Sequence, residues 1–81
     1  MIIVTLRQPI ELQLPDGRIR DASALIAASE HKGRGDRTYV LQRVMTNLYG
    51  GGWCIEDAVG TVTINEAIIA ATQEVPEADT K

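Results

Sequence analysis

Apolar and polar residues alternate in two short stretches near the start of the chain, residues 4–6 and 10–14, which is the pattern of half-buried β-strands. The apolar positions of this pattern are Val4, Leu6, Leu12 and Leu14. Pro15-Asp16-Gly17 predicts a turn directly afterwards, because proline presets φ and glycine accepts a positive φ. A second reversal is expected at Arg7-Gln8-Pro9. The segment is therefore predicted to form an antiparallel hairpin or a β-meander of two or three strands.

From residue 21 onward the spacing of apolar residues changes to that of helices. Asp21 or Ser23 is expected to cap a short, alanine-rich helix that runs to about Glu30. A second helix is predicted to begin at Asp36 and to end at the glycine triplet 50–52. Its apolar residues lie at i, i+3, i+4 and i+7, and they are Leu41, Val44, Met45 and Leu48.

Residues 53–59 allow two interpretations, a helical turn or a strand paired with residues 61–63, so the choice of helix or strand for 53–62 is open, and we favour the helical turn. Thr63 and Glu66 have the spacing of a capping box, which predicts a last helix that ends near Val75. The sequence thus predicts an α+β fold, with an N-terminal antiparallel β-meander or hairpin followed by three to four short helices. Residues 1–75 form one domain in this interpretation, and residues 76–81 form a disordered tail.

Composition limits both the stability and the partners of such a domain. A chain of 81 residues buries only about 60% of its unfolded surface. Because it has one cysteine, no internal disulfide can support this small core. We therefore expect a homo-oligomer or a bound partner to add stability. The net charge of −3 argues against nucleic acid as the partner, and no apolar run approaches the roughly 20 residues that would cross a membrane.

Few residues could perform chemistry. His31 and Cys54 are the single histidine and the single cysteine, and a thiol–imidazole pair also needs a third group that orients the base. A structural zinc site needs four ligands. The sequence predicts no catalytic residue, no metal site and no cofactor, and hence a protein that is not an enzyme.

A polar loop between the two predicted helices is a secondary binding candidate. Its cations are Lys32, Arg34 and Arg37. They could contact an acidic partner or remain solvated. The Gly33-Arg34-Gly35 sequence could also cradle a phosphate, but the fingerprint requires a strand leading into the loop, and none is predicted there.

The start of the chain carries the motif Val4-Thr5-Leu6-Arg7-Gln8-Pro9-Ile10-Glu11-Leu12, and an Asp-Gly turn and predicted helical segments follow it. This order of motif, turn and helices resembles small tail assembly chaperones of contractile-tailed and Mu-like phages. This resemblance implies a non-enzymatic phage or prophage protein in the host cytoplasm. It would bind the tape measure protein during tail assembly. The family has no catalytic residues that could be transferred to this chain.

Binding of an amphipathic client favours exposed, adaptable apolar side chains. The candidates near the glycine triplet are Met45, Leu48, Tyr49 and Trp53. The alternative is that Met45 and Trp53 fill the core of the domain. A second hypothesis for the function is a small phage-encoded inhibitor that binds a host protein.

Overall fold

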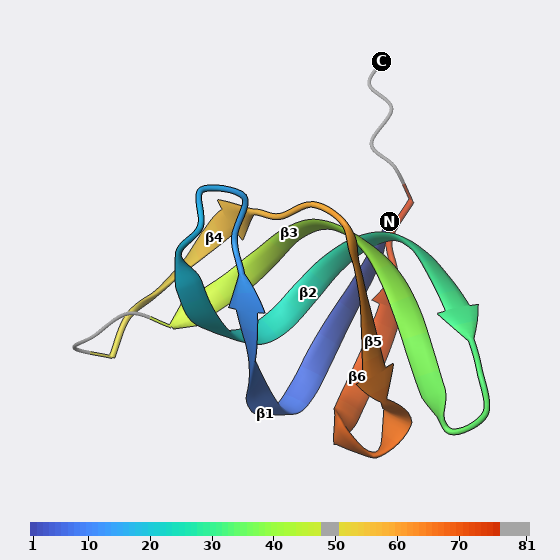
Figure 1. Ribbon diagram of the computed structural model, residues 1–81. Helices are drawn as coiled ribbons and strands as arrows, with labels where there is room; N and C mark the ends of the chain where they lie inside the picture. Colours follow the sequence, from blue (N-terminus) through green and yellow to red (C-terminus); the bar gives the residue numbers. More distant parts are fainter. Residues whose placement is uncertain (48–50, 77–81) are drawn as a thin grey trace.

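The computed structural model describes residues 1–47 and 51–76, and it shows a single antiparallel sheet of six strands (Figure 1). The elements are β1 (Ile2–Gln13), β2 (Ile19–Lys32), β3 (Asp36–Asn47), β4 (Trp53–Asp57), β5 (Thr61–Asn65), the 3-10 turn η1 (Glu66–Ile68) and β6 (Ile69–Glu74). The predicted α+β fold is therefore wrong. Across residues 1–47 and 51–76, η1 is the one helical element and is a single turn.

The long strands β1 and β3 each pair with different neighbours along their length. The strand order is β4-β3-β2-β1-β6, and β5 also pairs with β3. The C-terminal half of β3 pairs with β4, and its N-terminal half pairs with β5. Only the first half of β1 pairs with β6. The sheet is strongly bent (Figure 1), and side chains from β1, β2, β3, β5 and β6 meet in one core.

The turn predicted at residues 15–17 is confirmed. The amide of Leu14 donates to the carbonyl of Arg18 over 2.8 Å, and the amide of Gly17 donates to the carbonyl of Leu14 over 2.9 Å. Gly17 has a φ of 92°, which is accessible to glycine at little cost. The second reversal, expected at Arg7-Gln8-Pro9, is wrong. There β1 continues, with an irregular register between Thr5 and Ile10.

Strand β2 lies where the first helix was predicted. Ala22 and Leu25 are three positions apart, yet both are buried in the core. Ala22 pairs with Thr46 and Ala24 pairs with Met45, so Ser23 is an extra residue in the ladder. A β-bulge of this kind shifts the in–out alternation by one position. It therefore turns the period-two pattern of a strand into the i, i+3 spacing of a helix.

The second predicted helix is wrong for the same reason. Leu41 pairs with Ala27 and Arg43 pairs with Ile26, which leaves Gln42 as the extra residue of β3. Leu41 and Val44 therefore both point into the core. Leu48, the last residue of the predicted stripe, lies outside the described residues, as does Gly50. Asp36 was expected to cap the helix. It lies at the β2–β3 turn instead, where its backbone carbonyl accepts a hydrogen bond of 2.9 Å from the amide of Gly33.

Residues 53–75 form strands rather than helices. The favoured helical turn after Trp53 is wrong, because Trp53–Asp57 form strand β4. The strand alternative is correct for the element but not for its partner, since β4 and β5 each pair with β3 and not with each other. The last predicted helix is reduced to η1, and its cap is Asn65 instead of Thr63. The side chain of Asn65 accepts the amide of Ala67 over 2.8 Å. Residues 77–81 of the predicted tail lie outside the described part of the chain.

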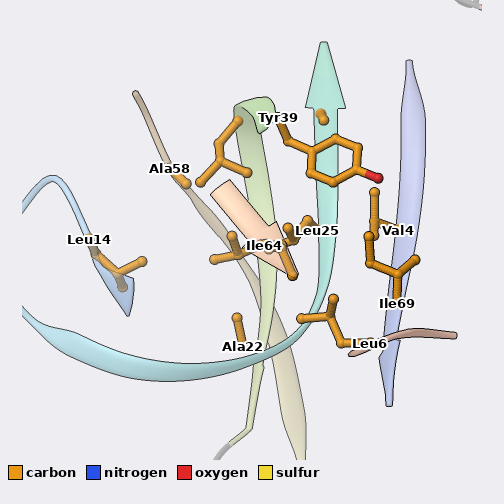
Figure 2. Close-up of a cluster of buried hydrophobic side chains, with 12 residues drawn as sticks. Val4, Leu6, Leu14, Ala22, Leu25, Tyr39, Ala58, Ile64 and Ile69 are labelled. Atoms are coloured by element: carbon orange, nitrogen blue, oxygen red, sulfur yellow. The ribbon is translucent and has the colours of Figure 1, made fainter. Parts of the chain in front are cut away.

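The core lies inside the bent sheet. Figure 2 shows Val4, Leu25, Tyr39 and Ile69 gathered between the strands. These side chains come from β1, β2, β3 and β6 and are buried. Ile64 of β5 also belongs to this cluster. Within the described ranges, no helix is long and apolar enough to cross a bilayer.

Candidate protein-binding surface at strand β4

The inner face of the sheet is apolar until it reaches β4. Val4, Leu25 and Val44 pair in one cross-strand row, and all three are fully buried. The next residue of this row, on β4, is Glu56. Cross-strand partners share one face of a sheet, so the row of core residues ends on a carboxylate that points inward.

Glu56 is held in this position by two side chains. The hydroxyl of Thr46 donates to one carboxylate oxygen over 2.7 Å, and Nη2 of Arg18 donates to the other over 2.6 Å. Thr46 is fully buried, and the side chain of Glu56 is 14% exposed. The Thr46 hydrogen bond lowers the pKa of Glu56, and Arg18 lowers it further. Glu56 is therefore a structural ion that fixes which side of β4 faces inward.

The outer face carries two large apolar side chains at β4. Ala24, Met45 and Ile55 pair in one cross-strand row, and Trp53 lies beside it on β4. We call the outer apolar face the set Ile3, Ala24, Ile26, Met45, Trp53 and Ile55. The same registers place the polar residues Thr5, Arg43 and Asp57 on this side of the sheet. Ala24 is itself buried at 8% exposure, and the other members lie outside the core cluster. Trp53 is 59% exposed and Ile55 is 47% exposed.

A shallow depression lies over part of this face. Its volume is about 630 Å³, and its lining residues are Met1, Ile26, Gln42, Arg43 and Asp57. Met1 and Ile26 are the apolar residues of this lining, and Gln42, Arg43 and Asp57 are polar or charged. In the described ranges, no second layer of secondary structure covers it.

Strand β4 also has an unpaired edge. The amide of Ala58 donates to the carbonyl of Gln42 over 3.1 Å. Ala58 and Gln42 therefore form a hydrogen-bonded pair, and such pairs alternate with non-hydrogen-bonded pairs along an antiparallel ladder. Two and four residues before Ala58, Glu56 and Cys54 direct their backbone amides and carbonyls toward β3. The backbone amides and carbonyls of Trp53, Ile55 and Asp57 point away from β3, toward the unpaired edge. Among residues 1–47 and 51–76, no strand pairs with this second edge.

A groove separates this edge from the β1–β2 turn. It has a volume of about 460 Å³, and it is lined by Leu14, Pro15, Asp16, Arg18, Ile55, Glu56 and Asp57. Arg18 crosses the groove, with its Nε 2.6 Å from Asp16 and its Nη2 2.6 Å from Glu56. The lining thus contains three carboxylates and one guanidinium, and it is acidic.

The structure brings two of the four candidate partner-binding residues together. Met45 and Trp53 lie on neighbouring strands of the outer apolar face. Trp53 does not fill the core, because it is largely exposed, and Met45 is half-buried on the side away from the core. Leu48 and Tyr49 lie outside the described residues. The role of these residues in binding stays a prediction.

The secondary candidate loop is the β2–β3 turn, far from β4 along β3. Lys32 and Arg34 are exposed there. Arg37 instead lies on β3, with Nη1 3.4 Å from Glu30 and Nε 3.7 Å from Glu66. Its charge is therefore balanced within the protein. Lys32 and Arg34 remain for a partner contact, which also stays a prediction.

Sequence reasoning missed Ile55 and Glu56. Residues 53–57 are three apolar residues followed by two acidic ones, so the segment lacks the period-two alternation of a half-buried strand. The segment is also only five residues long. Its sequence pattern therefore does not show which side chains face outward.

The single histidine and the single cysteine pair with residues that lie far apart along strand β3. Cys54 pairs with Thr46 near one end of β3, and its sulfur lies 3.4 Å from the Thr46 hydroxyl. His31 pairs with Thr38 near the other end of the same strand. The imidazole and the thiol therefore do not meet. Within the described part of the chain, no three His, Cys, Asp or Glu side chains form a cluster that could hold a metal ion.

Comparisons with known proteins give no further guide to this surface. No protein-family model, no curated protein and no solved structure matched the chain.

Proposed function

We propose that the protein is a non-catalytic binding module, which engages another protein through the outer apolar face. The single observation that carries this proposal is the inversion of β4. Trp53 and Ile55 point away from the core, whereas Glu56 points toward it. Leaving two large apolar side chains in water has no benefit for folding, because burial of such side chains stabilises a protein by about 1.5–3 kcal/mol each. A partner that covers them supplies that benefit.

Two classes of partner remain from the sequence. One is the tape measure protein, which a tail assembly chaperone would bind in the host cytoplasm. The other is a host protein, which a phage-encoded inhibitor would bind. The helical part of the chaperone pattern has no counterpart in these six strands, so this hypothesis now depends on the opening motif alone. The outer apolar face would serve either partner.

The test combines capture and direct binding. The tagged protein captures candidate partners from prophage-induced cells, and each candidate is then purified and titrated against three proteins by calorimetry. These are the wild type, Met45→Lys, which places a charge in the outer apolar face, and Thr61→Lys. Thr61 is exposed on β5, so it controls for the added charge. We expect Thr61→Lys to bind as the wild type does, and Met45→Lys to bind at least about tenfold more weakly.

Equal affinity of folded Met45→Lys and the wild type would reject the outer apolar face as the binding surface. If Met45→Lys does not fold, Trp53→Ser replaces it, because Trp53 is largely exposed and makes no part of the core. Amide NMR spectra of each variant establish folding before affinity is measured.

A further inference from the structure

We propose that the free edge of β4 accepts an extended strand of the partner, with lysine or arginine opposite Asp57 and a β-branched residue opposite Ile55. This inference rests on the proposed function, and it names the chemistry of the partner. The incoming chain would become the neighbour of β4 in the sheet, in antiparallel orientation like the pairs within the protein.

The backbone of β4 supplies the recognition. Trp53, Ile55 and Asp57 each direct an amide and a carbonyl away from β3, as the alternation from the Ala58–Gln42 hydrogen bond shows. These three residues offer the donor and acceptor pattern that an added antiparallel strand requires. Adding a strand would also cover an exposed sheet edge, which otherwise favours aggregation.

The side chains of β4 select which strand binds. Residues of the incoming strand that pair with Trp53, Ile55 and Asp57 would place their side chains on the outer apolar face. A β-branched residue opposite Ile55 would extend the row that Ala24, Met45 and Ile55 form. The Asp57 side chain is 91% exposed and lies 3.9 Å from Arg43. This carboxylate is open to a second cation from the partner.

The groove between the β4 edge and the β1–β2 turn also favours a basic partner. Alternate residues of the incoming strand would point into the groove lined by Asp16, Arg18 and Glu56. Asp16, Glu56 and Asp57 carry three negative charges there. They are opposed by Arg18, which is 2.6 Å from both Asp16 and Glu56, and by the exposed Arg43, which is 3.9 Å from Asp57. A second copy of this chain would bring the same acidic residues. Pairing Ile55 with Ile55 of that copy would place Trp53 opposite Asp57 and give it no cation. Charge complementarity therefore favours a basic strand over self-association.

Synthetic peptides test this proposal directly. The probe is acetyl-Thr-Lys-Thr-Val-Thr-Val-Thr-amide, in which lysine meets Asp57 and the first valine meets Ile55 in the antiparallel register. The matched control has glutamate in place of lysine. A second control has an N-methyl group on the valine that meets Ile55, which removes the backbone donor and keeps the side chain. Binding is followed from the amide NMR shifts of residues 53–57.

We expect the lysine peptide to bind about five- to tenfold more tightly than the glutamate peptide, since opposite charges stabilise a cross-strand pair and like charges destabilise it. The N-methylated peptide should not bind. Ile55→Pro should also abolish binding, because the Ile55 amide points away from β3 and proline there leaves the ladder with β3 complete. If Ile55→Pro is unfolded, the N-methylated peptide decides the same question.

Equal affinity of the protein for the lysine and glutamate peptides would overturn the proposal. Amide NMR shifts that change only away from β4 would overturn it as well. So would concentration-dependent dimerisation of a protein that does not bind the peptides. These outcomes are separate from a failure of the proposed function. If the peptides do not bind, but Met45→Lys still lowers the affinity for the full-length partner, the outer apolar face binds its partner without strand addition. If Met45→Lys binds the partner normally, the proposed function itself fails.

Discussion

The fully buried hydroxyl of Thr46 donates a hydrogen bond of 2.7 Å to Glu56 on the neighbouring strand. This contact directs the polar side of β4 inward, and because side chains alternate along a strand, it directs Trp53 and Ile55 outward. The Thr46–Glu56 pair thus connects the packing of the sheet to the surface proposed for binding.

Thr46→Val should lower the free energy of unfolding by about 1–2 kcal/mol. Valine keeps the shape of threonine but removes the donor, so the largely enclosed Glu56 carboxylate loses the Thr46 hydrogen bond and keeps the one from Arg18. The measurement is urea denaturation. Thr38→Val is the matched control, because the Thr38 hydroxyl bonds Thr63 over 2.8 Å at an exposed position. It should change stability by less than about 0.5 kcal/mol.

The same contact predicts that the free energy of unfolding depends on pH in the acidic range. The pKa of Glu56 is lowered in the folded protein from its usual value of 4.5, through the Thr46 hydrogen bond and then Arg18. The unfolded state therefore binds a proton first as the pH falls. The stabilisation by ionised Glu56 is complete above the unfolded-state pKa and is lost as the pH falls through the folded pKa. Denaturation curves of Glu56→Gln should show a shallower decline in acid. A parallel decline in both proteins would contradict this assignment.

Tyr39 predicts a second change of stability at high pH. Its side chain is fully buried, and its hydroxyl donates to Glu30 over 2.7 Å. Burial, and then the Glu30 hydrogen bond, raises the pKa of Tyr39 from 10.0 to about 12. Unfolded tyrosine ionises first, so the stabilisation is complete below pH 10 and is lost as the pH rises toward 12.

Tyrosinate absorbance of the folded protein should therefore show one tyrosine that titrates near pH 12, and Tyr39→Phe should lack this step. The variant should also lose about 1 kcal/mol of stability at neutral pH, as it removes one hydrogen bond. A variant that keeps the high-pH step would assign that step to Tyr49.

The inversion of β4 can be tested by two substitutions to threonine. Val44 is fully buried, whereas Ile55 is 47% exposed on the neighbouring strand. Val44→Thr should destabilise the protein by about 1–3 kcal/mol, because it buries a hydroxyl in the apolar core. Ile55→Thr should change stability by less than about 0.5 kcal/mol. Equal losses in thermal or urea denaturation would show that Ile55 belongs to the core.

Gly17 tests the β1–β2 turn. A Cβ at this position would meet no atom within 4 Å, so the cost of a side chain comes from the φ of 92° alone. Gly17→Ala should destabilise the protein by about 1–2 kcal/mol. Gly17→Asn should cost less, since asparagine accepts positive φ more readily. An alanine variant as stable as the wild type in urea denaturation would show that this turn does not need a positive φ.

The sequence predicted part of this fold for clear physical reasons. Leu12 and Leu14 alternate with polar residues, and Pro15-Asp16-Gly17 follows at once, so strand and turn were both encoded locally. The binding candidates Met45 and Trp53 were chosen for their side-chain type and their position near the glycine triplet, and the structure places them on one face. Ile55 and Glu56 were missed, because helical spacing had been assigned to their surroundings.

By itself the sequence determined the β1–β2 hairpin turn, the absence of an internal disulfide and the negative net charge. Tertiary structure decided the rest. The extra residues Ser23 and Gln42 shift the alternation of β2 and β3, so that Ala22 and Leu25, and likewise Leu41 and Val44, face the core at helical spacing. Local periodicity cannot separate such bulged strands from helices, because the difference lies in backbone pairing between residues far apart in the chain.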